Sequence, residues 1–197
     1  MKITNAPLPV KKTEQGFALL MTLIVVTVVI SIGLSVLDLS IKQVRLSTNA
    51  RDSEIAFHAA NAGMECARYI RRSLSNAMEN GTAISPNCFV GGPSPNTVTE
   101  ISSDSNGDVY RYDYAFSWGG AAPRCSQVTT LVASSSISGA GLVIANMTTL
   151  VPGYPTGATK TCAAGERCTV ISVRGYNKPC NSVSSYGTVQ REVLLQF

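Results

Sequence analysis

The main pattern along this chain is an uncharged apolar run near the N-terminus. No charged residue occurs from Gln15 to Leu37. The 21 residues from Phe17 to Leu37 would form a helix about 30 Å long, which matches the hydrocarbon core of a bilayer. Basic residues beside a span favour the cytoplasmic side, and Lys11 and Lys12 lie just before this one. The pattern predicts a single-pass segment with the N-terminus inside and residues 38–197 outside.

The helix is expected to continue well past the apolar run. No proline interrupts the chain from Phe17 to about Ser75, and its glycines are isolated. Beyond the span, apolar residues recur every three or four positions and form one stripe: Ile41, Val44, Ile55, Ala59, Ala62, Cys66 and Ile70. Most charged residues lie off it: Arg45, Arg51, Asp52, Glu54, Arg68, Arg71 and Arg72. We expect this half of the helix to lay one face on a globular head.

The periodicity changes to two after a linker at 79–97 that is rich in Gly, Pro, Asn and Ser. An Asn106-Gly107 hairpin turn is predicted to lead into a strand from Asp108 to Trp118. Its aromatic residues share one face, which is expected to be the core side packing on a helix: Tyr110, Tyr112, Tyr114, Phe116 and Trp118. Further strands are predicted at 141–151, 168–176 and 188–197. The fold class is therefore α+β, with a long N-terminal helix, membrane-spanning in its first half, packed on an antiparallel β-sheet head.

Six cysteines all follow the apolar run: Cys66, Cys88, Cys125, Cys162, Cys168 and Cys180. An even count on the expected outer side favours disulfides in an oxidising compartment. A structural metal site would need close pairs such as CxxC, and none is present. Six cysteines allow about fifteen pairings, and the sequence does not choose among them. We expect neither a metal nor another cofactor.

The net charge of +4 is spread along the chain without a block of like charge, so nucleic acid is not an expected partner. The only histidine, His58, lacks the pattern of a catalytic triad. No nucleophile, metal or phosphate motif is present, and the sequence indicates no enzyme. Residues 104–108 space oxygen ligands as a calcium loop begins, although a hairpin turn is the preferred interpretation. Asn80 and Asn146 begin formal glycosylation sequons.

Two stretches resemble type IV pilins. The polar, basic leader MKITNAPLPVKKTEQG ends in Gly16 and is followed at once by FALLMTLIVV, so it resembles a type III (prepilin) signal. The segment AFHAANAGMECAR is similar to the A-x-x-A-A-E-A-G segment of minor pilins with PilX-type N-termini. Together the two stretches cover roughly residues 11–72, about a third of the chain.

The resemblance implies a route of processing and assembly. Prepilin peptidase would cut between Gly16 and Phe17, and Phe17 would become an N-methylated first residue. The remaining helix would anchor the precursor in the membrane and later pack into a filament core, through side chains that include Leu19, Leu20, Leu23, Ile24, Val28 and Ile32. The implied partners are other pilin subunits, prepilin peptidase, the pilus assembly machinery and, before assembly, the membrane.

One position departs from the family pattern. Most major pilins carry a glutamate at the fifth residue after cleavage, where this chain has Met21. That glutamate is thought to pair with the N-terminal amine of a neighbouring subunit, and so to neutralise two charges in an apolar core. Its absence favours a minor or tip-type subunit over a bulk pilin.

The expected organisation is a leader at 1–16, a transmembrane or filament-core helix at 17–37, an amphipathic continuation at 38–78 and a disulfide-braced β-rich head at 79–197. The expected function is a structural subunit of a type IV pilus, located first in the cytoplasmic membrane and then in a surface filament. Two alternatives stay open. One is a pseudopilin of a type II secretion-like system, in a periplasmic pseudopilus. The other is a signal-anchored surface binding protein that never polymerises and keeps residues 1–16.

Overall fold

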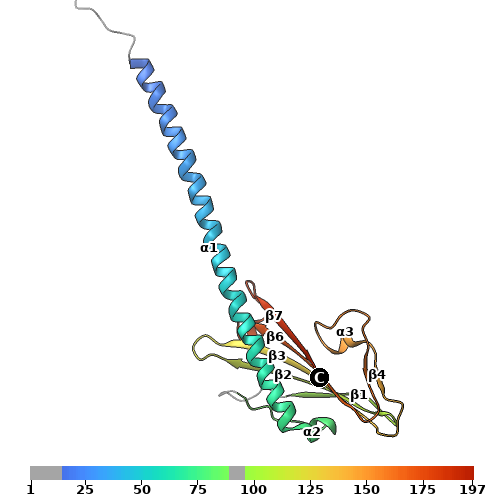
Figure 1. The fold of residues 1–197 in the computed structure, drawn as a ribbon. Helices are drawn as coiled ribbons and strands as arrows, with labels where there is room; N and C mark the ends of the chain where they lie inside the picture. The colour runs from blue at the N-terminus through green and yellow to red at the C-terminus, as the bar shows by residue number, and fades with distance from the viewer. Residues whose placement is uncertain (1–14, 89–95) are drawn as a thin grey trace, which may run out of the picture. The chain divides into compact units, whose positions relative to one another are not determined.

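The computed structural model describes residues 15–88 and 96–197, and its contacts divide the chain into two compact units after Asn49. We describe each unit by itself. The elements are labelled in Figure 1 and run, in chain order, α1 (Gln15–Ser73), α2 (Ser75–Glu79), β1 (Thr97–Asp104), β2 (Gly107–Trp118), β3 (Arg124–Ser135), β4 (Leu142–Ile144), α3 (Met147–Leu150), β5 (Lys160–Cys162), β6 (Arg167–Tyr176), the 3₁₀ turn η1 (Cys180–Ser182) and β7 (Gln190–Gln196).

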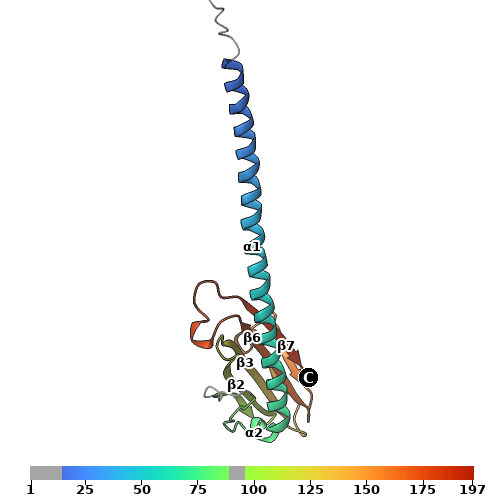
Figure 2. The same cartoon turned by 90° about the vertical axis from the view of Figure 1, so that its left-hand side faces the viewer.

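The second unit is a five-stranded antiparallel sheet with a helix on one face. The strand order is β1-β2-β3-β6-β7, and β4 pairs with β5 in a separate two-stranded ribbon. The part of α1 that belongs to this unit lies along the sheet, in front of its strands in the view of Figure 2. The prediction of an α+β fold with a long helix on an antiparallel sheet is confirmed.

Small residues let the helix approach the sheet closely. Ala56, Ala59 and Ala60 are fully buried on α1. They meet Gly175 of β6, where an added Cβ would lie 2.1 Å from the Ala60 backbone nitrogen and 2.2 Å from the Ala56 carbonyl oxygen. The Ser126 hydroxyl on β3 donates a 2.6 Å hydrogen bond to the Ala59 carbonyl oxygen. The contact therefore depends on main chain meeting main chain, which only small side chains permit.

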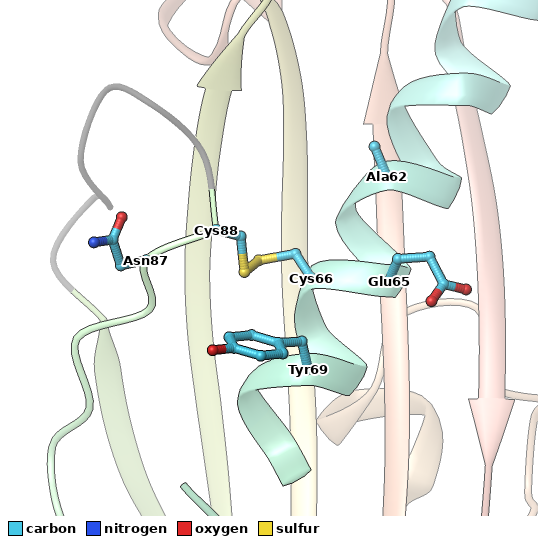
Figure 3. Close-up of a pocket in the computed structure, with 6 residues that line it drawn as sticks. All are labelled: Ala62, Glu65, Cys66, Tyr69, Asn87 and Cys88. Atoms are coloured by element: carbon cyan, nitrogen blue, oxygen red, sulfur yellow. A yellow bond between two sulfur atoms is a disulfide. The ribbon is translucent and has the colours of Figure 1, made fainter. Parts of the chain in front are cut away.

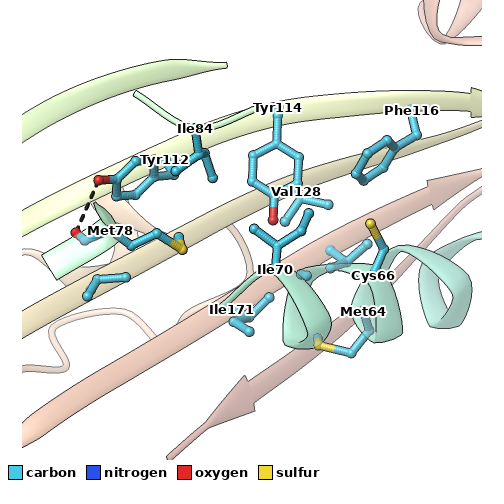
Figure 4. Packing of buried hydrophobic residues seen from close by; sticks show 13 residues of the cluster. Met64, Cys66, Ile70, Met78, Ile84, Tyr112, Tyr114, Phe116, Val128 and Ile171 are labelled. Carbon is cyan, nitrogen blue, oxygen red and sulfur yellow. Dashed lines mark hydrogen bonds between the residues drawn. The ribbon is translucent and has the colours of Figure 1, made fainter. Parts of the chain in front are cut away.

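The aromatic row of β2 forms part of the main core, as predicted from its alternation. Tyr112, Tyr114 and Phe116 are buried against Ile70 of α1 and Met78 of α2 (Figure 4). Tyr110 is partly buried at the edge of the same cluster. The side chain of Trp118 lies outside the described residues.

A second apolar cluster lies on the opposite face of the sheet. Val109, Leu131 and Val170 point to this side and pack under residues from the β4–β5 segment, among them Met147 and Val151. On β6, Val170 pairs with Leu131, and on β2, Val109 pairs with Ala133, two residues further along β3. This cluster covers only one end of the face, and the other end is polar.

The structure pairs all six cysteines as Cys66–Cys88, Cys125–Cys180 and Cys162–Cys168. The first joins α1 to the segment after α2, and the second joins β3 to η1. The third closes the turn between β5 and β6. Such cross-links restrict the unfolded chain and so stabilise a small head, more strongly for the longer loops.

Several local predictions were wrong. The strand expected at 141–151 ends at Ile144 and gives way to the short helix α3. Two strands of the sheet, β1 and β3, were not predicted. The stripe predicted on α1 is confirmed only in part: Ala59, Cys66 and Ile70 are buried, whereas Ile55 and Ala62 are half-buried. Ile41 and Val44 are exposed.

Candidate functional site

The first candidate surface is the N-terminal part of α1. Every residue from Gly16 to Ala50 is exposed, including the apolar residues singled out in the sequence: Leu19, Leu20, Leu23, Ile24, Val28 and Ile32. Phe17 is 65% exposed. The helix contains a stretch long and apolar enough to cross a membrane, and none of that stretch is buried within the chain. A helix that is apolar all round needs a covering from outside, either lipid or other helices.

Three of the four hydroxyl groups between Phe17 and Leu37 bond back to the helix. The hydroxyls of Thr22 and Thr27 donate to the carbonyl oxygens of Leu19 and Ile24 at 2.9 and 2.8 Å, and Ser35 donates to Ser31 at 2.9 Å. Because these hydroxyls bond back to the helix, they can enter an apolar environment without a lost hydrogen bond. The described part of the stretch therefore suits either lipid or a packed helical core.

A buried ion cluster anchors the other end of α1. Arg71, expected to lie off the packed stripe, is in fact buried. It donates to Glu79 of α2 at 2.7 Å and to the Thr169 hydroxyl of β6 at 2.9 Å. Glu79 is buried too, and the exposed Arg167 guanidinium lies 3.2 Å from its second oxygen. The sequence gives no signal for this cluster, because its members come from three elements. Its geometry fixes elements together and offers no free reactive group.

A surface pocket of about 480 Å³ lies beside the Cys66–Cys88 disulfide (Figure 3). Tyr69 exposes its ring there, and the Glu65 carboxylate, 3.0 Å from Arg68, contributes a charge. The two sulfur atoms are bonded to each other, so this pocket offers no thiolate. An aromatic ring beside a carboxylate provides a contact surface but not a catalytic group.

Burial controls the tyrosine chemistry of the head. Desolvation raises the pKa of the Tyr112 phenol to about 12, and the hydroxyl lies 3.1 Å from the Met78 carbonyl oxygen and 3.2 Å from that of Thr82. Burial also raises the pKa of Tyr114 and Tyr176 above the ordinary tyrosine value. These phenols stay protonated near neutral pH, and the hydroxyls of Tyr112 and Tyr176 donate hydrogen bonds within the head.

The remaining sequence candidates lie at the surface. His58 is exposed and sits 3.7 Å from Glu54 one turn earlier on α1. Residues 104–108 form the β1–β2 hairpin turn, as preferred, with the main-chain N–H of Asn106 donating to the Asp104 carboxylate at 2.7 Å. Asn80 and Asn146 are both exposed. Within residues 15–88 and 96–197, no group of three or more His, Cys, Asp or Glu residues could hold a metal ion.

Together these features define an α+β protein with an N-terminal helix apolar enough to anchor it in a membrane. Residues 15–65, about a quarter of the chain, match the family model described as PilX N-terminal. That model describes a type IV pilin-related N-terminal domain, and the match supports a PilX-type pilin, as the resemblance had indicated. The matched family is structural and not enzymatic. No curated protein and no solved structure matches the chain.

Proposed function

We propose that this chain is a minor or tip-type subunit of a type IV pilus, made as a prepilin and cleaved after Gly16. The observation that carries the proposal is the coincidence of two features in one segment. The residues that match the PilX N-terminal model, 15–65, include the helical surface from Phe17 to Leu37 that is apolar and wholly exposed in the single chain.

That surface would have two different surroundings in turn, first the membrane and then the filament. In the membrane, lipid covers the apolar side chains of α1 and the head lies outside. In the filament, helices of neighbouring subunits replace the lipid around α1. Because lipid tails are as apolar as these side chains, van der Waals packing and not the hydrophobic effect stabilises that contact. Met21 supports a minor position, because the chain brings no carboxylate of its own to the apolar run.

Processing of the N-terminus tests the proposal. Peptide mass spectrometry on a membrane fraction and on sheared surface material should find a peptide that starts at Phe17 with a methyl group on its amine. In Gly16→Val the leader should stay attached, whereas Gly33→Val should be cleaved normally. Both glycines lie in α1 with nothing within 4 Å of an added Cβ. A difference in cleavage between the two variants would therefore reflect recognition by the peptidase and not a change in folding.

The outcomes distinguish the candidates. An intact N-terminus at Met1 in every fraction would contradict the pilin proposal and favour a signal-anchored ectodomain. Processed protein that never appears in sheared material, in cells that do release pili, would instead favour a short periplasmic pseudopilus.

A further inference from the structure

The face of the sheet opposite α1 is divided between an apolar end and a polar end. The apolar end lies under the β4–β5 segment. At the polar end, neighbouring strands set up two rows of paired residues, Asp113–Thr129–Ser172 and Ala115–Gln127–Arg174–Glu192. Both rows therefore point to the same side of the sheet.

These rows border a pocket of about 300 Å³. The residues whose side chains face it are Asp113, Ala115, Gln127, Thr129 and Arg174. Ala115 is the only apolar side chain among them, so its short methyl leaves room for a ligand over a floor that is otherwise polar.

The Arg174 guanidinium forms no ion pair within the described part of the chain. Glu192 is its direct partner across the β6–β7 ladder, but this carboxylate accepts a 2.8 Å hydrogen bond from the Ser172 hydroxyl. It also lies against Gly153, where an added Cβ would come within 2.5 Å of the Glu192 Cδ. The Glu192 carboxylate is thus engaged by Ser172, and no ion pair or hydrogen bond of the Arg174 guanidinium occurs among residues 15–88 and 96–197.

The other polar groups leave a surplus of donors. Both Asp113 oxygens are engaged, one 2.7 Å from the Arg111 Nε and the other accepting from the Thr129 hydroxyl at 2.7 Å. Gln127 accepts a hydrogen bond from the Tyr176 hydroxyl through Oε1 at 3.1 Å, which leaves its amide N–H groups as donors. With Arg111 and Asp113 neutralising each other, the pocket keeps the positive charge of Arg174.

We propose that this pocket binds the carboxylate of an acidic saccharide unit, such as a uronic acid, with Arg174 and the Gln127 amide as its donors. A guanidinium and an amide on paired positions of adjacent strands match the planar, two-oxygen geometry of a carboxylate. The polar floor around Arg174, with Ala115 as the only apolar side chain that faces the pocket, suits the hydroxyl groups that a saccharide ring carries beside its carboxylate. The proposal goes beyond pilus assembly and does not depend on it.

The test uses the full chain in detergent micelles and ligand-observed saturation-transfer NMR. Glucuronic acid is the probe, and glucose, which has the same ring without the carboxylate, is its control. Glucuronic acid should bind and glucose should not. Arg174→Gln should weaken glucuronic acid binding by about tenfold or more, because a charge-assisted hydrogen bond is lost. The affinity of Arg174→Lys for glucuronic acid should lie between those of the parent chain and Arg174→Gln, since lysine keeps the charge without the paired guanidinium donors.

Arg72→Gln is the matched control, because it removes the same charge from an exposed helical site and should bind like the parent chain. Far-UV circular dichroism confirms that each variant is folded. Equal binding of glucose and glucuronic acid, or unchanged binding by a folded Arg174→Gln, would overturn the proposal. Tighter binding of N-acetylglutamate N-methylamide than of glucuronic acid would also overturn it, in favour of an acidic side chain of a protein partner.

Discussion

The two parts of α1 present opposite kinds of surface. From Phe17 to Leu37 the helix carries apolar side chains on every side, and every residue up to Ala50 is exposed; Leu19 is 69% exposed. After Ala50 the buried positions are mostly alanine and glycine, with Ala59 at 0%. Large, bare side chains suit partners outside the chain, whereas small, buried ones fit a single intramolecular surface. The same helix thus has one apolar surface without a partner in the single chain and another that is already buried against the sheet.

Because the two parts of α1 differ in this way, substitutions in them should have different effects. Substitutions in the packed part should change the stability of the head and leave the apolar surface as it is. Substitutions in the bare part should affect insertion or assembly and leave the unfolding of the head unchanged. The four changes below, measured on the full chain in micelles by denaturant unfolding with near-ultraviolet circular dichroism, test this separation.

The largest effect is expected for Glu79→Ala. This change leaves the buried Arg71 without its 2.7 Å partner, and an uncompensated buried charge costs about 3–5 kcal/mol of unfolding free energy. The control is Asp38→Ala, which removes an equally short ion pair to Lys42 where both side chains are more than 60% exposed. That pair should contribute less than about 1 kcal/mol. Equal effects from the two variants would show that the Arg71 cluster is not a buried anchor.

Gly175→Ala should come next. The added methyl group meets backbone atoms of Ala56 and Ala60, which cannot rotate away, so the helix must lift from the sheet. Overpacking of this kind costs up to about 3 kcal/mol. A head that keeps its full unfolding free energy in this variant would contradict the close approach of α1 to β6.

A matched pair within α1 tests the comparison directly. Gly63→Ala places a Cβ 2.7 Å from the Val173 Cγ1 and 2.8 Å from the Ser126 Cβ, and should destabilise the head by about 1–2 kcal/mol. Gly33→Ala meets nothing within 4 Å and should be neutral for the head, while raising helix propensity by about 1 kcal/mol. A loss of head stability in Gly33→Ala would mean that the two parts of the helix are not independent.

The sequence predicted elements whose periodicity is strong. The apolar run and the alternation of β2 gave the helix and the aromatic core directly. Strand β3 was missed because nearly all its residues are buried on both faces and Ser and Thr interrupt its apolar residues, so no alternation appears. Arg71 was misplaced because a charge is normally read as exposed, and its partner Glu79 belongs to another helix. The donor-rich pocket at Arg174 also has no sequence signal, since it depends on strand register.

The smallest effect is expected at Tyr112, whose buried phenol makes the unfolding free energy of the head depend on pH. Its phenol has a pKa of about 12 in the folded head because of burial, against about 10 when unfolded. The buried neutral phenol therefore contributes stability that is complete below pH 10 and is lost as the pH rises towards 12. Tyr112→Phe should lower the unfolding free energy by about 1 kcal/mol at pH 7, for one lost hydrogen bond, and should flatten its decline between pH 10 and 12. Tyr186→Phe, at a fully exposed position, should leave both unchanged. An unaltered alkaline decline in Tyr112→Phe would mean that other groups drive it and that this phenol is not shielded by the core.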